Sequence, residues 1–285
     1  MPERHTVETQ MAERQPGTPL LFERHSVGVA AVIPEGSDAA TIVFDLSIAA
    51  HPGQFLMISD LETDDKPFSI SGCGNGTVSV TARRVGRFSD RLLRARPGDR
   101  FSVRGAYGSS FFAHSGRVLL IGGGCAVPPL AYLAESLTAA GAGVTFVNGA
   151  RDGSSLLCRE RLSDLPLRQI VALEAESGTT AVDEAVHLLR TEAFERIYAA
   201  GPEAMMVALL PHCETIPSQF LIERYMKCGM GICGSCTLDP LGLRVCVEGP
   251  VLDREVLVSA LEFGVYRRDA SGARVPLANR EVCTR

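Results

Sequence analysis

Four cysteines near the end of the chain restrict its fold more than any other feature. Cys228, Cys233, Cys236 and Cys246 follow the spacing C-x4-C-x2-C-x9-C. This is the plant-type ferredoxin spacing, in which four thiolates hold a [2Fe-2S] cluster that passes single electrons. The run from Lys227 to Cys236 is rich in glycine, which adopts positive-φ conformations that aim backbone N–H groups at a cluster. The spacing therefore predicts a [2Fe-2S] site with these four ligands.

Two other interpretations of the cysteine run stay open, a structural zinc site and a chance cluster of buried thiols. Zinc sites are usually built from paired C-x2-C knuckles, which the x4 gap does not fit. Cys246 follows the turn Asp239 to Gly242 in an alternating segment, so we expect a hairpin to return it to the loop. The other cysteines are scattered, and we expect them to be packing residues: Cys73, Cys125, Cys158, Cys213 and Cys283. Burial is also expected for the apolar neighbours of the loop: Phe220, Leu221, Ile222, Tyr225 and Met226.

Length and charge exclude several classes of protein. A chain of 285 residues suits two or three domains. Its net charge is −5 and it has no basic block, so nucleic acid and anionic membrane surfaces are not expected as partners. No apolar stretch approaches the length of a membrane span, and the polar start lacks the hydrophobic region of a signal peptide. These features predict a cytoplasmic protein with reduced thiols.

The strand and helix patterns predict three folded parts with an extension at each end. Residues 1–19 are predicted to be a disordered tail. Residues 20–115 show short strands separated by turns, which is typical of a small antiparallel barrel. Residues 116–217 alternate strand and helix as in a parallel sheet, 218–255 hold the cysteines, and 256–285 form a C-terminal extension. The predicted fold class is a β barrel plus an α/β domain with a small cluster subdomain.

Two glycine turns lie where parallel sheets bind their ligands. The strand Arg117–Ile121 runs into Gly122-Gly123-Gly124 before a helix from Pro128 to Ala140, and the strand Arg196–Ala200 runs into Gly201-Pro202. Ligands bind at the carboxyl ends of parallel strands, where a pyrophosphate can rest on N–H groups at a helix start. The run is not the full G-x-G-x-x-G fingerprint, so tight packing explains these glycines equally well when the segment is taken alone.

The order of barrel, α/β sheet and cysteine loop resembles the ferredoxin-NADP reductase superfamily. The run Met226 to Cys236, continued by Arg244 to Val251, resembles the electron-transfer subunit of class 1B dihydroorotate dehydrogenase. The resemblance covers about residues 20–255 and carries the cluster ligands over to the four cysteines. It also implies FAD and NAD as cofactors and an FMN-containing catalytic dihydroorotate dehydrogenase as partner, in a heterotetramer that serves pyrimidine biosynthesis.

The resemblance places FAD on the predicted barrel. The family's Arg-Pro-(hydrophobic)-Ser motif corresponds to Lys66 to Ser69, where lysine keeps the charge but not the bidentate fork of arginine. Its Gly-Lys-Gly-Thr motif corresponds to Gly86 to Ser89, with phenylalanine in place of the second glycine. The FAD-binding residues implied are Lys66, Pro67, Phe68, Ser69, Thr81, Ala82, Arg83, Phe88 and Ser89.

The resemblance places NAD on the two glycine turns. Gly122 to Pro129 resembles the family's Gly-Gly-Gly-x-Gly-x-Pro-Pro loop with Ala126 at a glycine position, and Ala200 to Met205 resembles Cys-Gly-Pro-x-x-Met with alanine for cysteine. The NAD-binding residues implied are Gly122, Gly123, Gly124, Gly201 and Pro202. Hydride transfer from a flavin requires no side-chain acid or base, so no catalytic residue is predicted.

The expected function is the transfer of electrons from a partner through the cluster and FAD to NAD+. One alternative is a similar subunit of a hydrogenase or ferredoxin-NADP oxidoreductase complex; some of the latter have aspartate at the first cysteine position, and Cys228 argues against that branch. The other is a redox-sensing cluster protein without NAD binding. The departures at Lys66, Phe88, Ala126 and Ala200 leave that alternative open.

Overall fold

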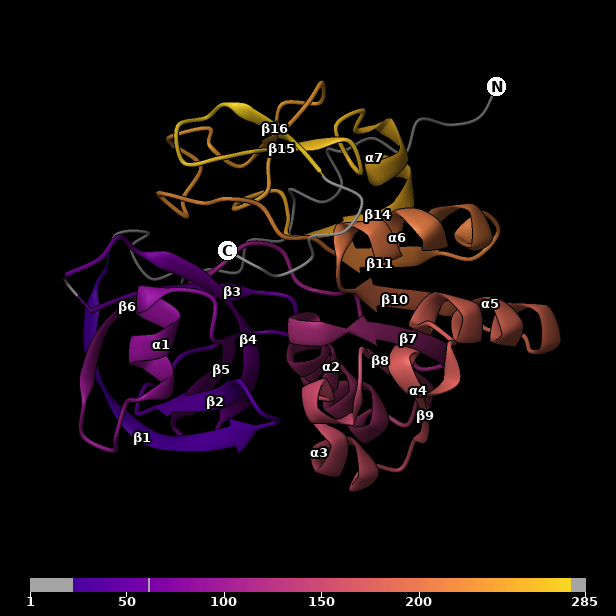
Figure 1. Cartoon of the computed structure of the whole chain (residues 1–285), viewed down its shortest axis with the longest axis horizontal. Coiled ribbons are helices and arrows are strands. Elements are labelled where there is room, and N and C mark those ends of the chain that lie inside the picture. Colours follow the sequence, from indigo (N-terminus) through magenta and orange to yellow (C-terminus); the bar gives the residue numbers. More distant parts are fainter. Residues whose placement is uncertain (1–22, 61, 278–285) are drawn as a thin grey trace.

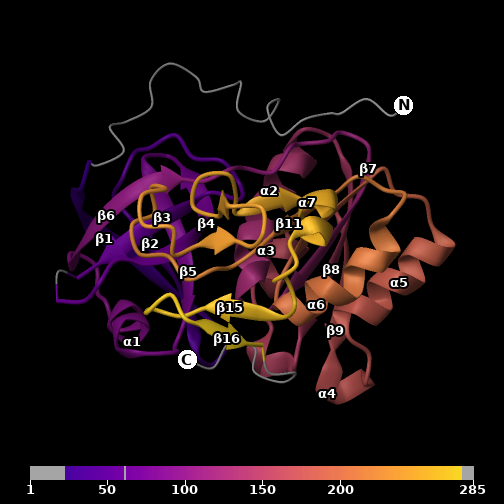
Figure 2. The same cartoon turned by 90° about the horizontal axis from the view of Figure 1, so that it is seen from above.

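The computed structural model describes residues 23–60 and 62–277, so the predicted tail, residues 1–19, lies outside the described residues. Figure 1 shows a barrel at the left, an α/β domain at the right, and the C-terminal part of the chain above both. Seen from above in Figure 2, this C-terminal part spreads over the junction of the two domains. No helix within the described ranges combines the length and apolarity that crossing a bilayer requires.

The N-terminal domain is a closed antiparallel barrel, as predicted. Its interior is filled by alternate residues of the strands, such as Leu56 and Ile58 from one strand and Val78 and Val80 from another. This period of two is what places one face of each strand in the core. In pairing order the barrel strands are β1 (His25–Glu35), β2 (Ala39–Phe44), β5 (Thr77–Arg83), β4 (Lys66–Gly74), β3 (Phe55–Ser59) and β6 (Arg100–Tyr107).

The second domain is a six-stranded sheet covered by helices on both faces. One face packs Val118 and Leu120 against α2, and the other packs Leu119 and Ile121 against α5 and α6. The strands, in sheet order, are β14 (Val251–Asp253), β11 (Ser218–Leu221), β10 (Arg196–Ala200), β7 (Arg117–Gly123), β8 (Gly143–Ala150) and β9 (Arg168–Leu173). The helices of the chain are α1 (Arg87–Leu93), α2 (Val127–Ala139), α3 (Arg159–Ser163), α4 (Glu174–Ser177), α5 (Ala181–Thr191), α6 (Glu203–Leu209) and α7 (Arg254–Ser259).

The sheet takes in two strands that the sequence placed in the cluster subdomain. β11 runs parallel to β10, and β14 returns antiparallel to β11, pairing Leu221 with Val251. The cluster segment is therefore an excursion between two neighbouring strands of the sheet. Within it, β12 (Thr237–Leu238) and β13 (Leu243–Arg244) form the expected hairpin.

The C-terminal extension adds α7 and a second hairpin, β15 (Tyr266–Arg268) with β16 (Arg274–Pro276). One hydrophobic core joins all the parts, because Phe55 and Met57 on the outside of the barrel pack in the same cluster as Ile121 of the sheet and Cys236 of the cluster segment. The two domains and the cluster segment thus share buried side chains instead of meeting across a polar seam.

Candidate functional site

The four predicted cluster ligands lie together in two pairs. The Cys236 and Cys246 side chains are hydrogen-bonded, and the backbone N–H of Cys246 lies 3.4 Å from Cys236 Sγ. Cys228 and Cys233 form the other hydrogen-bonded pair. Across the described part of the chain, no three cysteine, histidine or carboxylate side chains converge on one point as a single metal ion requires. Two pairs of thiols suit a cluster with two irons better than a mononuclear zinc site.

The loop between the first two ligands directs backbone donors at both pairs. The N–H of Met230 lies 3.5 Å from Cys228 Sγ, and that of Gly231 donates to Cys246 Sγ at 3.2 Å. The loop bends this sharply because Gly229, Gly231 and Gly234 have φ values of +72°, +80° and +69°. Such N–H groups stabilise sulfur that carries negative charge, as cluster ligands do.

The environment of the thiols differs from pair to pair. Burial by itself would raise the pKa of the Cys233 thiol. Hydrogen bonds to Ser235 and to Cys228 outweigh this effect and lower the pKa of Cys233 to about 6. The hydrogen bond with Cys246 lowers the pKa of Cys236 to about 7 and raises that of Cys246. Cys236 and Cys246 are buried and Cys233 is exposed, so the cluster site has one sealed side and one open side. Ile232, 71% exposed, lies on the open side.

The implied FAD strand divides its side chains between two faces. Pro67 and Ser69 pair with Met57 and Phe55, whose side chains belong to the shared core beside the cluster segment. Phe68 points the other way, into the barrel. The strand therefore has one face available to FAD, which carries Pro67 and Ser69. Lys66 lies at the start of the strand.

Three of the other residues expected to bind FAD have buried side chains whose contacts lie within the protein. Phe88 is 5% exposed and lies 5.9 Å from the Phe68 ring and 6.3 Å from the Phe101 ring, measured between centroids. Ala82 is buried in the same core. Ser89 Oγ accepts hydrogen bonds from the N–H groups of Val85 and Gly86, both at 2.9 Å. Contact between these residues and FAD would therefore use their backbone.

Arg83 and Thr81 stand at the end of β5 that faces the α/β domain. Arg83 Nη1 lies 4.0 Å from the position that a Cβ atom of Gly124 would occupy, and its Nε pairs with Asp38 at 3.1 Å. Thr81 Oγ1 is hydrogen-bonded to Thr41 Oγ1 at 2.7 Å. The structure thus brings a cation of the barrel to the glycine turn of the sheet, where a pyrophosphate would need one.

The two glycine turns lie side by side, as predicted. Gly122 at the end of β7 pairs with Ala200 at the end of β10. A Cβ on Gly123 would stand 2.9 Å from Met205 Sδ and 3.1 Å from Pro202 Cδ, so a side chain there would displace Met205 and crowd the second turn. Gly124, at φ +56°, then starts the short 3₁₀ turn (Gly124–Ala126) that leads into α2. A turn between a strand and a helix at the carboxyl edge of a parallel sheet is where such sheets bind their ligands.

A buried ion network that sequence reasoning missed connects the second glycine turn to the cluster hairpin. Arg224, with its side chain 3% exposed, binds both carboxylate oxygens of Glu203 at 2.7 and 3.0 Å. It also donates to Glu262 Oε1 at 3.2 Å, and Glu262 Oε2 accepts the N–H of Asp239 at 3.1 Å. Glu203 directly follows Pro202, and Asp239 lies between Cys236 and Cys246. No local pattern marks these charges, since the partners lie 21 and 38 residues apart.

Asp239 is in turn the anchor of the C-terminal extension. Its Oδ2 accepts hydrogen bonds from Tyr266 Oη at 2.9 Å, from Arg268 at 2.6 Å and from Arg274 at 3.0 Å. The side-chain hydrogen bond from Tyr266 and the two arginines lower the pKa of Asp239, so it is charged at neutral pH. The β15–β16 hairpin is thereby fixed to the hairpin that carries Cys236 and Cys246.

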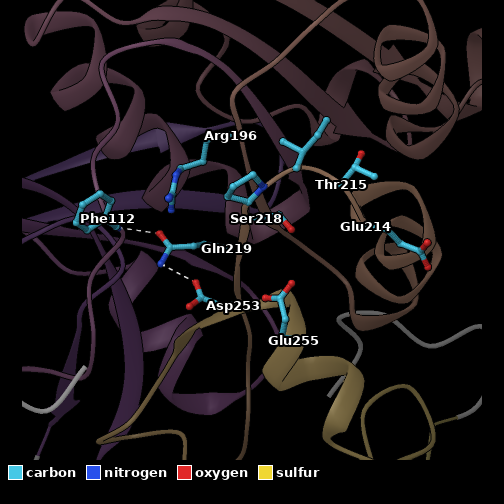
Figure 3. Close-up of a pocket in the computed structure, with 10 residues that line it drawn as sticks. Phe112, Arg196, Glu214, Thr215, Ser218, Gln219, Asp253 and Glu255 are labelled. Atoms are coloured by element: carbon cyan, nitrogen blue, oxygen red, sulfur yellow. Dashed lines mark hydrogen bonds between the residues drawn. The ribbon is translucent and has the colours of Figure 1, made fainter. Parts of the chain in front are cut away.

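A cavity of about 540 Å³ lies at the other edge of the sheet, away from every predicted site residue. Figure 3 shows Arg196 and Ser218, at the amino ends of β10 and β11, together with Asp253 and Glu255. Gln219 accepts the N–H of Phe112 at 2.8 Å and donates to Asp253 at 3.1 Å. The cavity is therefore separate from the glycine turns at the carboxyl edge.

Comparison with known proteins agrees with this geometry. Residues 223–258 match the family model described as the iron-sulfur cluster binding domain of dihydroorotate dehydrogenase B. The chain is 37% identical to the probable dihydroorotate dehydrogenase B (NAD(+)) electron transfer subunit of Methanothermobacter thermautotrophicus, over 86% of this chain and 94% of the relative. It is 35% identical to the protein of that name from Methanocaldococcus jannaschii, over 86% and 95%.

Solved structures share the fold. A structure of the NADH-dependent reduced ferredoxin-NADP oxidoreductase superposes with a TM-score of 0.74 at 24% identity, over 87% of this chain and 95% of that chain. Ferredoxin-NADP+ reductase from Plasmodium falciparum gives 0.57 at 13% identity, over 70% and 92%. Both confirm the predicted combination of barrel and α/β domain.

Proposed function

Because the chain belongs to the family of dihydroorotate dehydrogenase B electron transfer subunits, we propose that it passes electrons from a catalytic partner subunit to NAD+. When bound, a [2Fe-2S] cluster supplies single-electron transfer and FAD supplies conversion between single electrons and hydride. The four cysteines would hold the cluster, and the Pro67 and Ser69 face of β4 with Arg83 would hold FAD. The glycine turns at Gly122–Gly124 and Gly201-Pro202 would hold NAD.

One observation carries this proposal: the cluster loop is seated on the barrel beside the strand expected to bind FAD. Gly229, next to Cys228, contacts Met57, and Met57 pairs with Pro67. The two cofactors would therefore be held on the same face of a single strand pair, with no flexible linker between them. Cys233, exposed on the far side of the loop, is where a partner could take or deliver an electron.

The substrate of the catalytic partner is proposed from the relatives' name, as dihydroorotate. The chemistry on that substrate is assigned to the partner, since the relatives are named electron transfer subunits. The chain's own residues bind, orient and shield the cofactors.

The test is anaerobic purification followed by iron, zinc and flavin analysis of one sample. About two irons and one FAD per chain are expected, with the visible absorbance bleached by NADH. Co-expression with the catalytic dihydroorotate dehydrogenase should then give dihydroorotate-dependent reduction of NAD+. Zinc in place of iron, or iron without flavin, would refute the proposal.

A further inference from the structure

A buried arginine of the barrel reaches the backbone of the first cluster ligand. Arg104 lies in β6 and is 5% exposed. Its Nη1 and Nη2 atoms each donate a hydrogen bond of 3.2 Å to the carbonyl oxygen of Cys228. Nη1 also lies 3.3 Å from the Tyr107 hydroxyl, which holds the guanidinium from a second side. This two-pronged contact fixes the backbone of Cys228 against the barrel.

The same guanidinium is tied to the strand expected to bind FAD. Its Nε donates a hydrogen bond of 2.9 Å to Asp65 Oδ2, and its Nη2 donates to the same oxygen. Asp65 directly precedes Lys66, the first residue of β4. One buried side chain thus joins the start of the FAD strand to a cluster ligand.

The group carries a net positive charge. Asp65 has a second cationic partner, Arg24, at 2.9 Å. Although burial opposes the shift, hydrogen bonds from Arg24 and Arg104 lower the pKa of Asp65, so the carboxylate is charged at neutral pH. Two cations and one anion leave the group with one net positive charge, and Arg104 is the cation in contact with Cys228. The side chains of Arg104 and Asp65 are 6% and 12% exposed, so salt screens these two charges only weakly, whereas Arg24 is 43% exposed and is screened more strongly.

A cluster gains one negative charge on reduction, and a nearby positive charge favours that state. The reduction potentials of iron–sulfur clusters depend on net charge, hydrogen bonding and exposure. We infer that Arg104 is a positioning residue that fixes Cys228 to the FAD strand and raises the reduction potential of the cluster. The inference rests on the proposed function, since it requires a cluster at these cysteines.

The test uses two substitutions with opposite effects on charge in the full chain, purified anaerobically. Arg104→Gln removes the positive charge, and Asp65→Asn removes the negative charge beside it. The readouts are iron per chain and the midpoint potential from a redox titration followed by EPR. We expect Arg104→Gln to shift cluster reduction about tenfold toward the oxidised form, about 59 mV for one electron, and Asp65→Asn to shift it the opposite way.

Two further variants separate charge from geometry. Arg100 lies on the same strand as Arg104, but its side chain is exposed and donates a hydrogen bond of 3.1 Å to Ser26 Oγ. The variant Arg100→Gln should therefore leave the midpoint potential unchanged. Arg104→Lys keeps the positive charge but loses the bidentate guanidinium contact. We therefore expect the midpoint potential to stay unchanged and the EPR line shape to change. A potential that falls as far as in Arg104→Gln would contradict a role for the charge.

Shifts of the same sign in Arg104→Gln and Asp65→Asn, or no shift in either while both retain iron, would overturn the inference. If Arg104→Gln loses its iron, Asp65→Asn decides alone, because only a charge effect raises the potential in that variant. A wild-type chain that binds no iron and no FAD would refute the proposed function and this inference together. If the wild-type protein binds iron and FAD but the variants have the same midpoint potential as wild type, only the inference is refuted.

Discussion

Met57 in β3 lies directly against Gly229 in the cluster loop: a Cβ atom on Gly229 would stand 2.6 Å from Met57 Cγ. Gly229 also has a φ of +72°, which disfavours any other residue. Glycine is required here for two separate reasons, the backbone conformation and the space that the barrel leaves.

The substitution Gly229→Ala separates these reasons when it is compared with Gly242→Ala. Gly242 has a similar φ of +68°, but a Cβ there would meet nothing within 4 Å. We expect Gly242→Ala to cost about 1–2 kcal/mol of unfolding free energy, the penalty of the left-handed conformation alone. Gly229→Ala should cost more and should lower the iron bound per chain. Equal losses in the two variants would show that the contact with Met57 has no energetic weight.

Replacing a buried ligand tests the assignment of the cluster. Cys246→Ser should abolish the EPR signal of the reduced cluster, because one iron then lacks a thiolate. Cys213→Ser is the matched control: Cys213 is also buried, and burial raises its pKa to about 11, but it belongs to the 3₁₀ turn Leu210–Cys213 and not to the cysteine run. Iron content should stay unchanged in the control, and loss of iron in both variants would contradict the assignment.

The network around Arg224 predicts a large loss of stability on substitution. Arg224→Met would leave two carboxylates unpaired, one of them Glu262, whose side chain is fully buried. Breaking a buried pair in this way costs about 3–5 kcal/mol of unfolding free energy. Arg117→Met, which removes an exposed pair with Glu192, should cost about 0–1 kcal/mol. Chemical denaturation of both variants measures the difference, and equal costs would count against a stabilising role of the network.

The C-terminal hairpin should detach when Asp239 loses its charge. At pH 7 we expect Asp239→Asn to make the segment Tyr266–Pro276 several-fold more sensitive to protease, since hydrogen bonds to charged groups contribute about 1.5–3 kcal/mol. Because the folded pKa of Asp239 is lowered, its stabilisation is present above the ordinary carboxyl value of about 3.9 and is lost as the pH falls through the lower folded pKa. In wild type the hairpin should therefore stay protected from pH 7 down to about pH 4. Asp99→Asn, which frees Arg91 on the barrel, should leave the cleavage rate unchanged.

A side chain added between the two glycine turns should weaken NADH binding without changing the amounts of iron and FAD bound. A Cβ on Gly201 would stand 2.4 Å from Met205 Cε and 3.3 Å from the nitrogen of Gly123. We expect Gly201→Ala to raise the KM for NADH about tenfold, the equivalent of about 1.4 kcal/mol, with iron and FAD contents unchanged. Gly143→Ala, where the nearest atom is Arg117 Cγ at an ordinary 3.6 Å, serves as the control. An unchanged KM in Gly201→Ala would place the nicotinamide site elsewhere.

The parts of the fold with strong local patterns could be predicted. The alternating barrel strands, the helix expected at Pro128–Ala140 and the hairpin that returns Cys246 are all confirmed. The burial of Phe220, Leu221, Ile222 and Met226 is confirmed as well, whereas Tyr225 is only partly buried. β4 was expected from the family resemblance alone, because its proline and glycines hide the strand pattern. β11 was assigned to the cluster subdomain because periodicity cannot place a short apolar run in a particular sheet.

The sequence could indicate which cysteines and glycine turns come together, but not the contacts that depend on packing. Thiol ligands and glycine turns are local in sequence. The direction of the Phe88 side chain is decided by the aromatic residues that it meets in the barrel, Phe68 and Phe101. The contact of Arg104 with Cys228 spans 124 residues, so only the assembled core reveals it.

The antiparallel pairing of β11 with β14 has a consequence for how the chain could be taken apart. Residues 222–250 leave the sheet at Leu221 and rejoin it at Val251, and the N–H of Ile222 bonds the carbonyl of Pro250 at 3.0 Å. The ends of this long excursion already stand in the geometry of a hairpin closure. A tight turn grafted between them would delete all four cysteines and keep β11 beside β14, but it would also remove Arg224, the buried partner of Glu203 and Glu262.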